Sequence, residues 1–318
     1  MIKSFYIALF LYGSFSALAL ENYLEYHQKV IQAEDLIASE KFQDALLTLE
    51  ELFDNYEFIF LREYKLAAQL AVIIQDGSKA LMYIKKGIAK GWSPQSVAKN
   101  KILVPLTKSA TWESIKSNYS ADPEHLEINY NLRGQVQAMY KKDQKKALGA
   151  LFKVGNKAQE KYGNKKFAPH SEEQMVKLIN ILNEYGYPGE KLIGNDYWMS
   201  TILSHHNSLS EEYVKNDTLF QFIKPKLEVA LEKGEISPFE FALISDWRMA
   251  VISNHKATIY GYLGDIHGAD DAVKINNDRK NIGLRSIALR NKLLDLEKKY
   301  NFNCYLPGEP WQKGKITF

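Results

Sequence analysis

Apolar residues recur at helical spacing through most of this chain, and near its amino end they recur as two similar units. Two apolar stripes fill residues 24–55, on either side of a break at 39–41, and the second stripe returns about 35 residues later. The matching positions are Ala45 and Ala80, Leu46 and Leu81, and Leu49 and Ile84. Small residues at the first of these positions let paired helices approach closely. No stretch alternates cleanly enough to indicate a strand, apart from a short candidate over 258–263, so the sequence predicts an all-α fold.

This first part of the chain, residues 20–120, resembles tetratricopeptide repeats, which are helical hairpins with a period near 34 residues. The positions that carry the resemblance are Tyr64, Ala67, Ala68, Ala71, Ala80 and Ile84. Two units are fewer than the usual three, so we expect the segment with Trp92 and Trp112 to cover the open end. The resemblance implies a protein or peptide partner for these helices. The alternative is that they only pack on the next domain.

The first 19 residues have the pattern of an export signal. Lys3 precedes an apolar run over 5–15, and Ala17-Leu18-Ala19 is a small-residue cleavage site. A helix over 5–20 would be about 24 Å long, shorter than the roughly 30 Å hydrocarbon core of a bilayer. We therefore expect a periplasmic or secreted protein without a membrane span once the signal is cleaved, with an uncleaved anchor as the alternative.

Composition indicates a globular protein that relies on packing. The 318 residues suggest about two domains, and 46% of them are hydrophobic. We place the boundary at Asp122-Pro123, a helix-start signal, which gives repeat-like helices over 20–120 and a helical domain over 121–318. The 41 basic and 38 acidic residues give a net charge of only +3, which does not indicate nucleic-acid binding. The single cysteine, Cys304, excludes an internal disulfide.

The second part of the chain is expected to consist of irregularly connected helices. The expected elements are a polar helix over about 124–162 that is interrupted near Gly149 or Gly155; a helix that opens with a capping box at Ser171 and Gln174 and ends at Gly186; a helix from near Asn195 to His205-His206; a helical stretch over 209–232 with a kink or break at Pro225; a helix opened by Ser237-Pro238; a loop over 254–277; and a last helix over about 284–300. The lysine-rich run 141–146 is expected to be a solvated face.

Residues from about 124 to 302 also resemble a bacterial family of all-helical domains with no assigned function. The family shows Asp-Gln followed by Arg, Gly-Trp-Pro followed by Gly, Gln-His, Asp-Arg, Tyr-Gly-Thr-Gln, and an Arg shortly before Ile-Gly-Leu. The chain matches these motifs at Asp143-Gln144, Gly186-Tyr187-Pro188, Gly194, His206, Asp246, Tyr260-Gly261, Arg279 and Ile282-Gly283-Leu284. It departs from them at Ala147, His205, Trp247 (with Arg248 one step late), Tyr262 and Leu263.

The resemblance implies one polar site formed by His206, Asp246, Tyr260 and Arg279. Their expected roles are acid or base, orienting carboxylate, hydroxyl donor and anion clamp. The additional candidates for binding are Asp143, Gln144, His205 and Arg248. The alternative is a buried polar network that fixes how the helices pack, because buried polar groups must satisfy one another.

Several kinds of site have no signature in the sequence. It contains no H-E-x-x-H motif, no paired cysteines, no G-x-S-x-G elbow and no phosphate-binding loop. We therefore predict neither a metal nor a cofactor. The leading hypothesis is an exported helical binding or scaffold protein that recognises a protein or a small ligand. One alternative is a hydrolase that uses the polar site, and another is a purely structural envelope protein.

Overall fold

The computed structural model describes residues 22–119, 128–152, 155, 158, 161–194, 196–306 and 314–317. Within these ranges the secondary structure is helical and includes no strand, so the all-α prediction is confirmed. The short strand proposed over 258–263 is instead a series of bends. The expected signal over 1–19 and the helix-start signal at Asp122-Pro123 lie outside the described residues.

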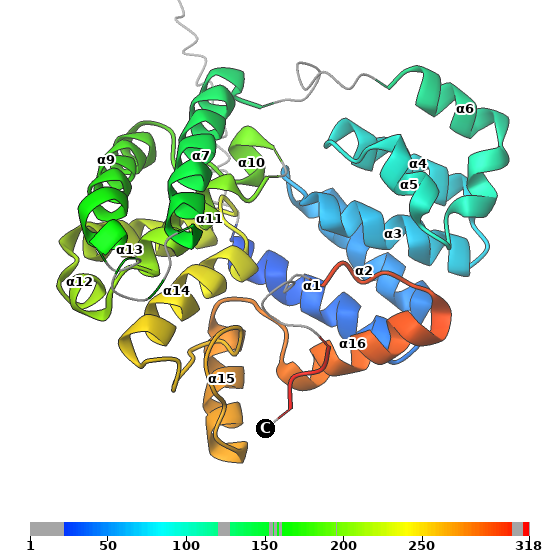
Figure 1. Ribbon diagram of the computed structural model, residues 1–318. Coiled ribbons are helices and arrows are strands. Elements are labelled where there is room, and N and C mark those ends of the chain that lie inside the picture. The colour runs from blue at the N-terminus through cyan, green and yellow to red at the C-terminus, as the bar shows by residue number, and fades with distance from the viewer. Residues whose placement is uncertain are drawn as a thin grey trace, which may run out of the picture.

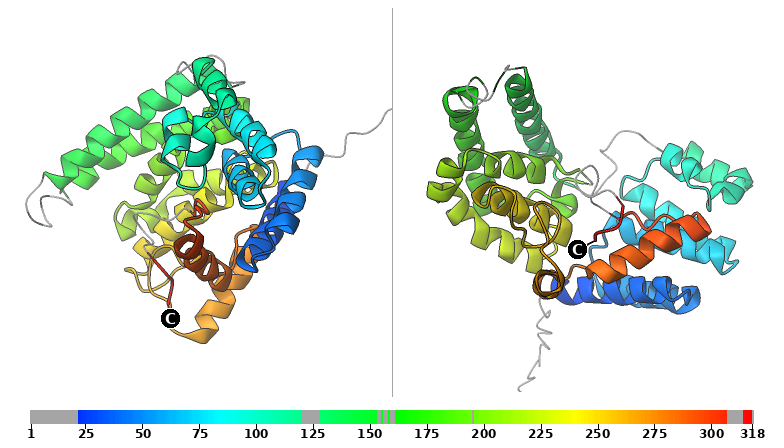
Figure 2. Two further views of the ribbon diagram at one scale, coloured as in Figure 1. Left: turned by 90° about the vertical axis from the view of Figure 1, so that its right-hand side faces the viewer. Right: turned by 60° about the horizontal axis from the view of Figure 1, so that its bottom comes forward.

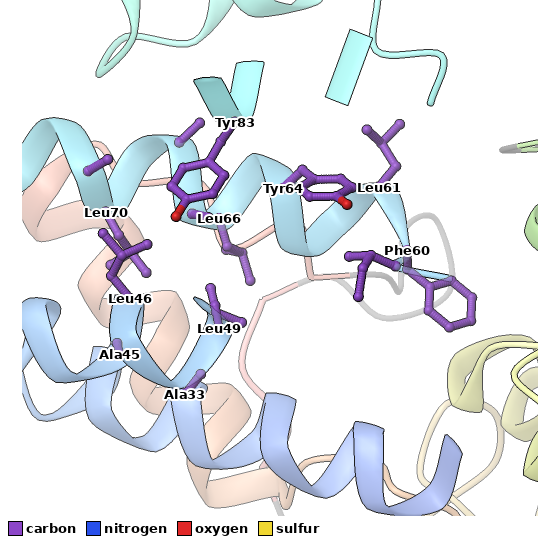
Figure 3. Close-up of a cluster of buried hydrophobic side chains, with 14 of the residues drawn as sticks. Ala33, Ala45, Leu46, Leu49, Phe60, Leu61, Tyr64, Leu66, Leu70 and Tyr83 are labelled. Carbon is purple, nitrogen blue, oxygen red and sulfur yellow. The ribbon is translucent and has the colours of Figure 1, made fainter. Parts of the chain in front are cut away.

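The amino-terminal helices form two antiparallel hairpins (Figure 1). α1 (Tyr23–Ala38) pairs with α2 (Phe42–Asn55), and α3 (Leu61–Ile73) pairs with α4 (Gly77–Ala89). The repeated alanines, Ala45 and Ala80, are fully buried, as close helix pairing requires. Figure 3 shows the core between the hairpins, where Leu46 and Leu49 of α2 meet Leu66 and Leu70 of α3.

Short helices follow the hairpins: α5 (Pro94–Lys99), a 3-10 helix at Val104–Lys108, and α6 (Ala110–Ser117). Trp92 and Trp112 are buried in the same core as the hairpins, as the sequence predicts.

A second core forms among helices from the middle of the chain. They are α7 (Tyr130–Leu151), α9 (Ala168–Glu184), α10 (Glu190–Ile193), α11 (Trp198–Asn207), α12 (Glu211–Asn216), α13 (Thr218–Glu232) and α14 (Pro238–Ile252). A short π-helix at Gly163–Phe167 leads into α9. α9 ends two residues before Gly186, whose φ of 89° is the left-handed conformation expected after a helix end. Asn195, the expected start of α11, lies outside the described residues.

The carboxyl-terminal helices return to the beginning of the chain. α15 (Ala269–Asn281) leads to α16 (Ile287–Tyr300), which packs against α1 (Figures 1 and 2). Leu289, Leu293 and Leu296 of α16, together with Phe302, are buried in the amino-terminal core. The residues of that core therefore come from both ends of the chain.

Three expected features of the second part are wrong. The loop over 254–277 contains most of α15, whose buried residues are few (Ala272, Ile275 and Arg279), so its apolar stripe is weak. α9 begins at Ala168 rather than at a Ser171 capping box, because it continues directly from the π-helix; Ser171 therefore lies inside the helix, and its hydroxyl contacts His206. The stretch 209–232 is broken at Asp217, which caps α13, and not at Pro225, which lies inside that helix.

No helix in the described part of the chain has both the length and the apolar character needed to cross a bilayer.

Candidate functional site

His206 lies at the centre of a buried network that joins three helices. Ser171 Oγ of α9 is 2.8 Å from His206 Nδ1, and Asp217 Oδ2 is 2.9 Å from His206 Nε2. A carboxylate only accepts, so the Nε2 proton points to Asp217 and a neutral ring accepts the Ser171 hydroxyl at Nδ1. Asp217 also accepts from the amides of Leu219 and Phe220 at the start of α13.

Serine, histidine and aspartate in this order are the residues of a hydrolytic triad. A triad also needs a serine that the substrate can reach, whereas Ser171 is 1% exposed and His206 is fully buried. An open cavity of about 530 Å³ beside α12 is lined by Asp217 and Tyr213, and neither Ser171 nor His206 is among its lining residues. The geometry therefore joins α9, α11 and α13 but gives a substrate no path to Ser171.

His205 faces a different neighbour. Its Nδ1 lies 2.6 Å from Asp143 Oδ2 of α7, and Gln144 Nε2 is 3.4 Å from the same oxygen. Asp143 is fully buried although it lies in the lysine-rich run 141–146, so the expectation of a solvated face is wrong at this position. The lysines of the run that are exposed are Lys141, Lys142 and Lys145.

Asp246, Tyr260 and Arg279 form another network, in which Tyr260 takes part through its backbone. Asp246 accepts hydrogen bonds from the amides of Ile259, Tyr260 and Tyr262, at 2.8–2.9 Å. Burial raises the pKa of the Asp246 carboxyl, while these three amides oppose that rise. Arg279 donates from Nη1 to the Tyr260 carbonyl and from Nε to the Arg285 carbonyl. These contacts hold the loop after α14 against the start of α16.

Arg248, another binding candidate, lies beside Asp217 of the His206 network. Its Nη1 is 3.7 Å from Asp217, and its guanidinium stands 5.2 Å from the Phe220 ring centroid. Arg248 and Tyr260 both line an open cavity of about 620 Å³ between α13 and α14. Among the eight candidates, the structure thus joins His206 with Arg248 through Asp217, Asp143 with His205 and Gln144, and Asp246 with Tyr260 and Arg279.

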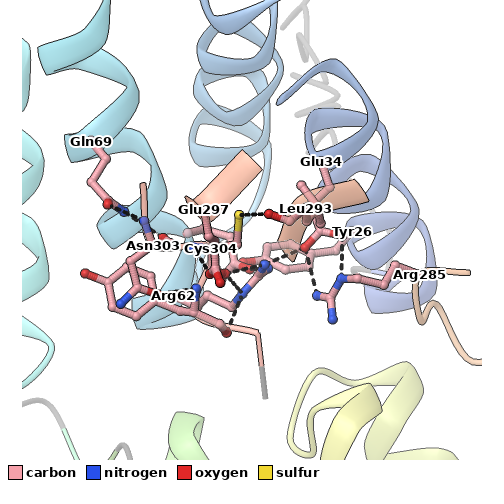
Figure 4. Close-up of polar contacts among 11 residues, drawn as sticks. Tyr26, Glu34, Arg62, Gln69, Arg285, Leu293, Glu297, Asn303 and Cys304 are labelled. Carbon is pink, nitrogen blue, oxygen red and sulfur yellow. Dashed lines mark hydrogen bonds and ion pairs between the residues drawn. The ribbon is translucent and has the colours of Figure 1, made fainter. Parts of the chain in front are cut away.

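The Arg279–Arg285 contact leads to a more strongly charged cluster between the two cores. Arg285 donates to both carboxylate oxygens of Glu34 on α1, and Arg62 of α3 donates to Glu34 Oε1 (Figure 4). Arg62 also donates to the carbonyls of Cys304 and Tyr305. Although burial acts against ionisation, the two guanidinium groups keep the pKa of Glu34 below its ordinary value.

Beside this cluster lies a small cavity of about 90 Å³, which we call the junction pocket. α1, α3, α10, the start of α14 and the turn before α16 all contribute to it. Its lining includes His27, Val30, Ile31, Phe60, Arg62, Glu63, Glu190, Tyr197, Phe239, Gly283, Leu284 and Arg285. Gly283 has φ 71°, and a Cβ there would lie 2.5 Å from the Cβ of His27, so only glycine fits at this wall.

The titratable groups of the junction pocket are strongly perturbed. Burial, reinforced by Glu63 and Glu240, raises the pKa of Glu190 to about 8. Burial also raises the pKa of Glu63. Burial and the two arginines lower the pKa of His27 to about 3, so its ring is neutral at physiological pH. The Nε2 atom of His27 is buried and has no hydrogen-bond partner. Perturbed groups that gather in a cavity are typical of functional sites.

Sequence reasoning missed the junction pocket because its charged residues come from helices that are distant in sequence. One local signal was present: Glu34 follows Val30 by four residues and precedes Ile37 by three, which places a carboxylate on the apolar face of α1. A charge on an apolar face predicts a buried partner, but the sequence does not show that Arg62 and Arg285 are the partners.

Comparison with models of protein families, with curated proteins and with solved structures gave no match. Within the described residues, no group of three or more His, Cys, Asp or Glu side chains is arranged to hold a metal ion.

Proposed function

We propose that the protein is an exported helical binding protein that takes a small ligand in the junction pocket. The repeat-like helices form one wall of this pocket and the second helical core forms the other. The observation that carries the proposal is the unpaired, buried Nε2 of His27 in a cavity that also contains Glu63 and Glu190. Such a polar atom costs free energy unless a partner satisfies it.

The networks around Asp246 and Arg279 support this proposal as positioning elements. Asp246 holds the Tyr260 amide, Arg279 holds the Tyr260 carbonyl, and Arg279 also holds the Arg285 carbonyl. The Arg285 side chain then reaches the wall of the junction pocket. In this proposal the family-like residues set the shape of the pocket without contacting the ligand.

The test is a ligand-observed NMR screen of small polar fragments against the mature protein and two variants. Ile31→Phe enlarges a residue that lines the junction pocket, while Ile115→Phe makes the same change in a separate cavity between α4 and α6. We expect fragment signals that disappear in Ile31→Phe and persist in Ile115→Phe. An absence of hits, or hits that persist in both variants, contradicts the proposal.

A hydrolase is the second candidate, because Ser171, His206 and Asp217 have triad-like contacts. Labelling by a fluorophosphonate probe, with Ser171→Ala as the control, tests it. Because Ser171 is buried, we expect no labelling of the wild-type protein, which would count against the hydrolase. Labelling of the wild type that is lost in Ser171→Ala would favour the hydrolase. A peptide partner for the amino-terminal helices stays a prediction from the tetratricopeptide resemblance, as does export.

A further inference from the structure

We infer that the ligand of the junction pocket is a small organic cation with a primary ammonium group and a short apolar body. This inference rests on the proposed function and specifies the chemistry of the same pocket.

The charges around the junction pocket leave room for one positive group. Arg62 and Arg285 line the pocket, but both donate to Glu34, which is not among the lining residues, and Arg62 Nη1 also lies 3.5 Å from Glu63 Oε1. Glu63 and Glu190 face the pocket. If every group were ionised, the positive charges of Arg62 and Arg285 would face the negative charges of three carboxylates, those of Glu34, Glu63 and Glu190. Lys65 and Glu240 nearby add one charge of each sign and so leave this difference unchanged. A single ammonium group would balance this cluster.

The two lining carboxylates are only partly engaged by the protein. Glu63 Oε2 accepts the Tyr26 hydroxyl at 3.3 Å, and Glu63 Oε1 is 3.5 Å from Arg62. Glu190 Oε1 accepts the Leu61 amide at 2.6 Å. Each carboxylate oxygen has about two lone-pair sites, so further donors fit on both side chains. An ammonium group brings three N–H donors, which matches this arrangement of acceptors.

His27 supplies an independent observation that points to a ligand. It is 6% exposed, lines the pocket, and has an Nε2 without a partner. A neutral imidazole with its proton on Nδ1 presents Nε2 as an acceptor, so it suits an N–H donor and gives no repulsion toward a cation. Burial, together with Arg285 and Arg62, disfavours the charged form of His27, so protonation of the ring does not satisfy this atom.

The remaining walls favour a short hydrocarbon body. Val30, Ile31, Phe60, Phe239 and Leu284 line the pocket, and its volume of about 90 Å³ suits a ligand of a few heavy atoms. An anionic ligand of the same size would face Glu63 and Glu190, while the two arginines in the lining are already paired with Glu34.

Burial raises the pKa of Glu190 to about 8, so a proton on this carboxyl lowers the negative charge of the cluster at pH 7. Glu63 and Glu240 add to this rise, while Lys65 and the Leu61 amide act against it. An amine with a pKa near 10 stays protonated at pH 7. Its binding should therefore transfer the Glu190 proton to the buffer, with no change in the ligand's own protonation.

The experiment is calorimetric titration of the mature protein at pH 7 with three branched probes of similar size and different charge: isobutylamine, isobutanol and isobutyrate. We expect only isobutylamine to bind, with an observed enthalpy that depends on the ionisation enthalpy of the buffer. Glu190→Gln keeps an acceptor for the Leu61 amide, and we expect it to weaken binding about tenfold or more and to remove the buffer dependence. Glu63→Gln is the second variant and should also weaken binding. Glu113→Gln, an exposed residue of α6, is the control and should bind like wild type.

The outcomes separate this inference from the proposed function. Binding of isobutanol or isobutyrate, lost in Ile31→Phe, overturns the cation and leaves the pocket as a binding site. Amine binding that survives both Glu190→Gln and Ile31→Phe shows attachment elsewhere and overturns the inference. If none of the probes binds, the inference is overturned, and the fragment screen alone decides whether the pocket binds any ligand.

Discussion

Arg285 and Glu34 are joined by two hydrogen bonds, of 2.7 Å from Nε and 2.8 Å from Nη2, although 251 positions separate them in the chain. Both side chains are buried. This pair attaches the turn before α16 to the first helix, and Arg62 adds a second guanidinium to the same carboxylate. Breaking a buried ion pair by removing one partner is strongly destabilising, because the other charge is left uncompensated.

Glu34→Gln should lower the free energy of unfolding by about 3–5 kcal/mol, since it leaves two buried guanidinium groups without their shared anion. Chemical denaturation measures this change. Glu51→Gln, which removes an exposed partner of Lys29, is the matched control and should have little effect. Equal stability of the two variants would show that the Glu34 cluster does not stabilise the attachment of the turn before α16 to α1.

Asp246→Asn should destabilise the protein by about 1–3 kcal/mol, because one acceptor oxygen cannot replace two for the three loop amides. Hydrogen exchange should show faster exchange of the amides of Ile259, Tyr260 and Tyr262. The control is Asp295→Asn, which changes an exposed partner of Lys315. Unchanged exchange in the loop would contradict the positioning role.

His206→Ala should cost about 1–3 kcal/mol, because it leaves Ser171 and Asp217 without their common partner in a buried place. The thermal midpoint should fall by several degrees. His267→Ala, at an exposed histidine, should leave the midpoint near that of wild type. An unchanged or higher midpoint for His206→Ala would instead favour a catalytic or binding role, because such residues are often suboptimal for stability.

Glu190→Gln should change how stability depends on pH. The folded-state pKa of Glu190, about 8, lies above its ordinary value of 4.5, so between these values the folded state binds more protons than the unfolded state. Stability due to Glu190 is therefore complete below about pH 4.5 and declines as the pH rises to about 8. The variant should gain stability relative to wild type across this window, as measured by denaturation at several pH values. Glu113→Gln should show no such trend, and a flat difference curve for Glu190→Gln would contradict the assignment.

Cys304 should be unreactive in the folded protein. It is 1% exposed, and burial together with Glu297 raises the pKa of its thiol. Because the thiolate is the reactive form, alkylation by iodoacetamide should be slow under native conditions and fast in denaturant. Rapid labelling of the native protein would show that the segment after α16 opens readily.

The sequence by itself determined the helical class and the hairpins at the amino end. Local periodicity was sufficient there, since the apolar stripes with Ala45 and Ala80 place small residues between paired helices. The turn at Gly186 was also readable, because its left-handed backbone favours glycine. α15 was missed because its buried residues are too few to form a clear stripe.

The tertiary structure decided which polar residues meet. A single sequence does not show which residue a charged or polar side chain will contact. Hydrogen bonds depend on distances of about 3 Å, which only the packed helices establish. Packing therefore placed Ser171 against His206, turned Asp143 inward among lysines, and brought Glu34, Arg62 and Arg285 together. The junction pocket exists for the same reason: its walls come from both cores, and neither part of the chain encloses it alone.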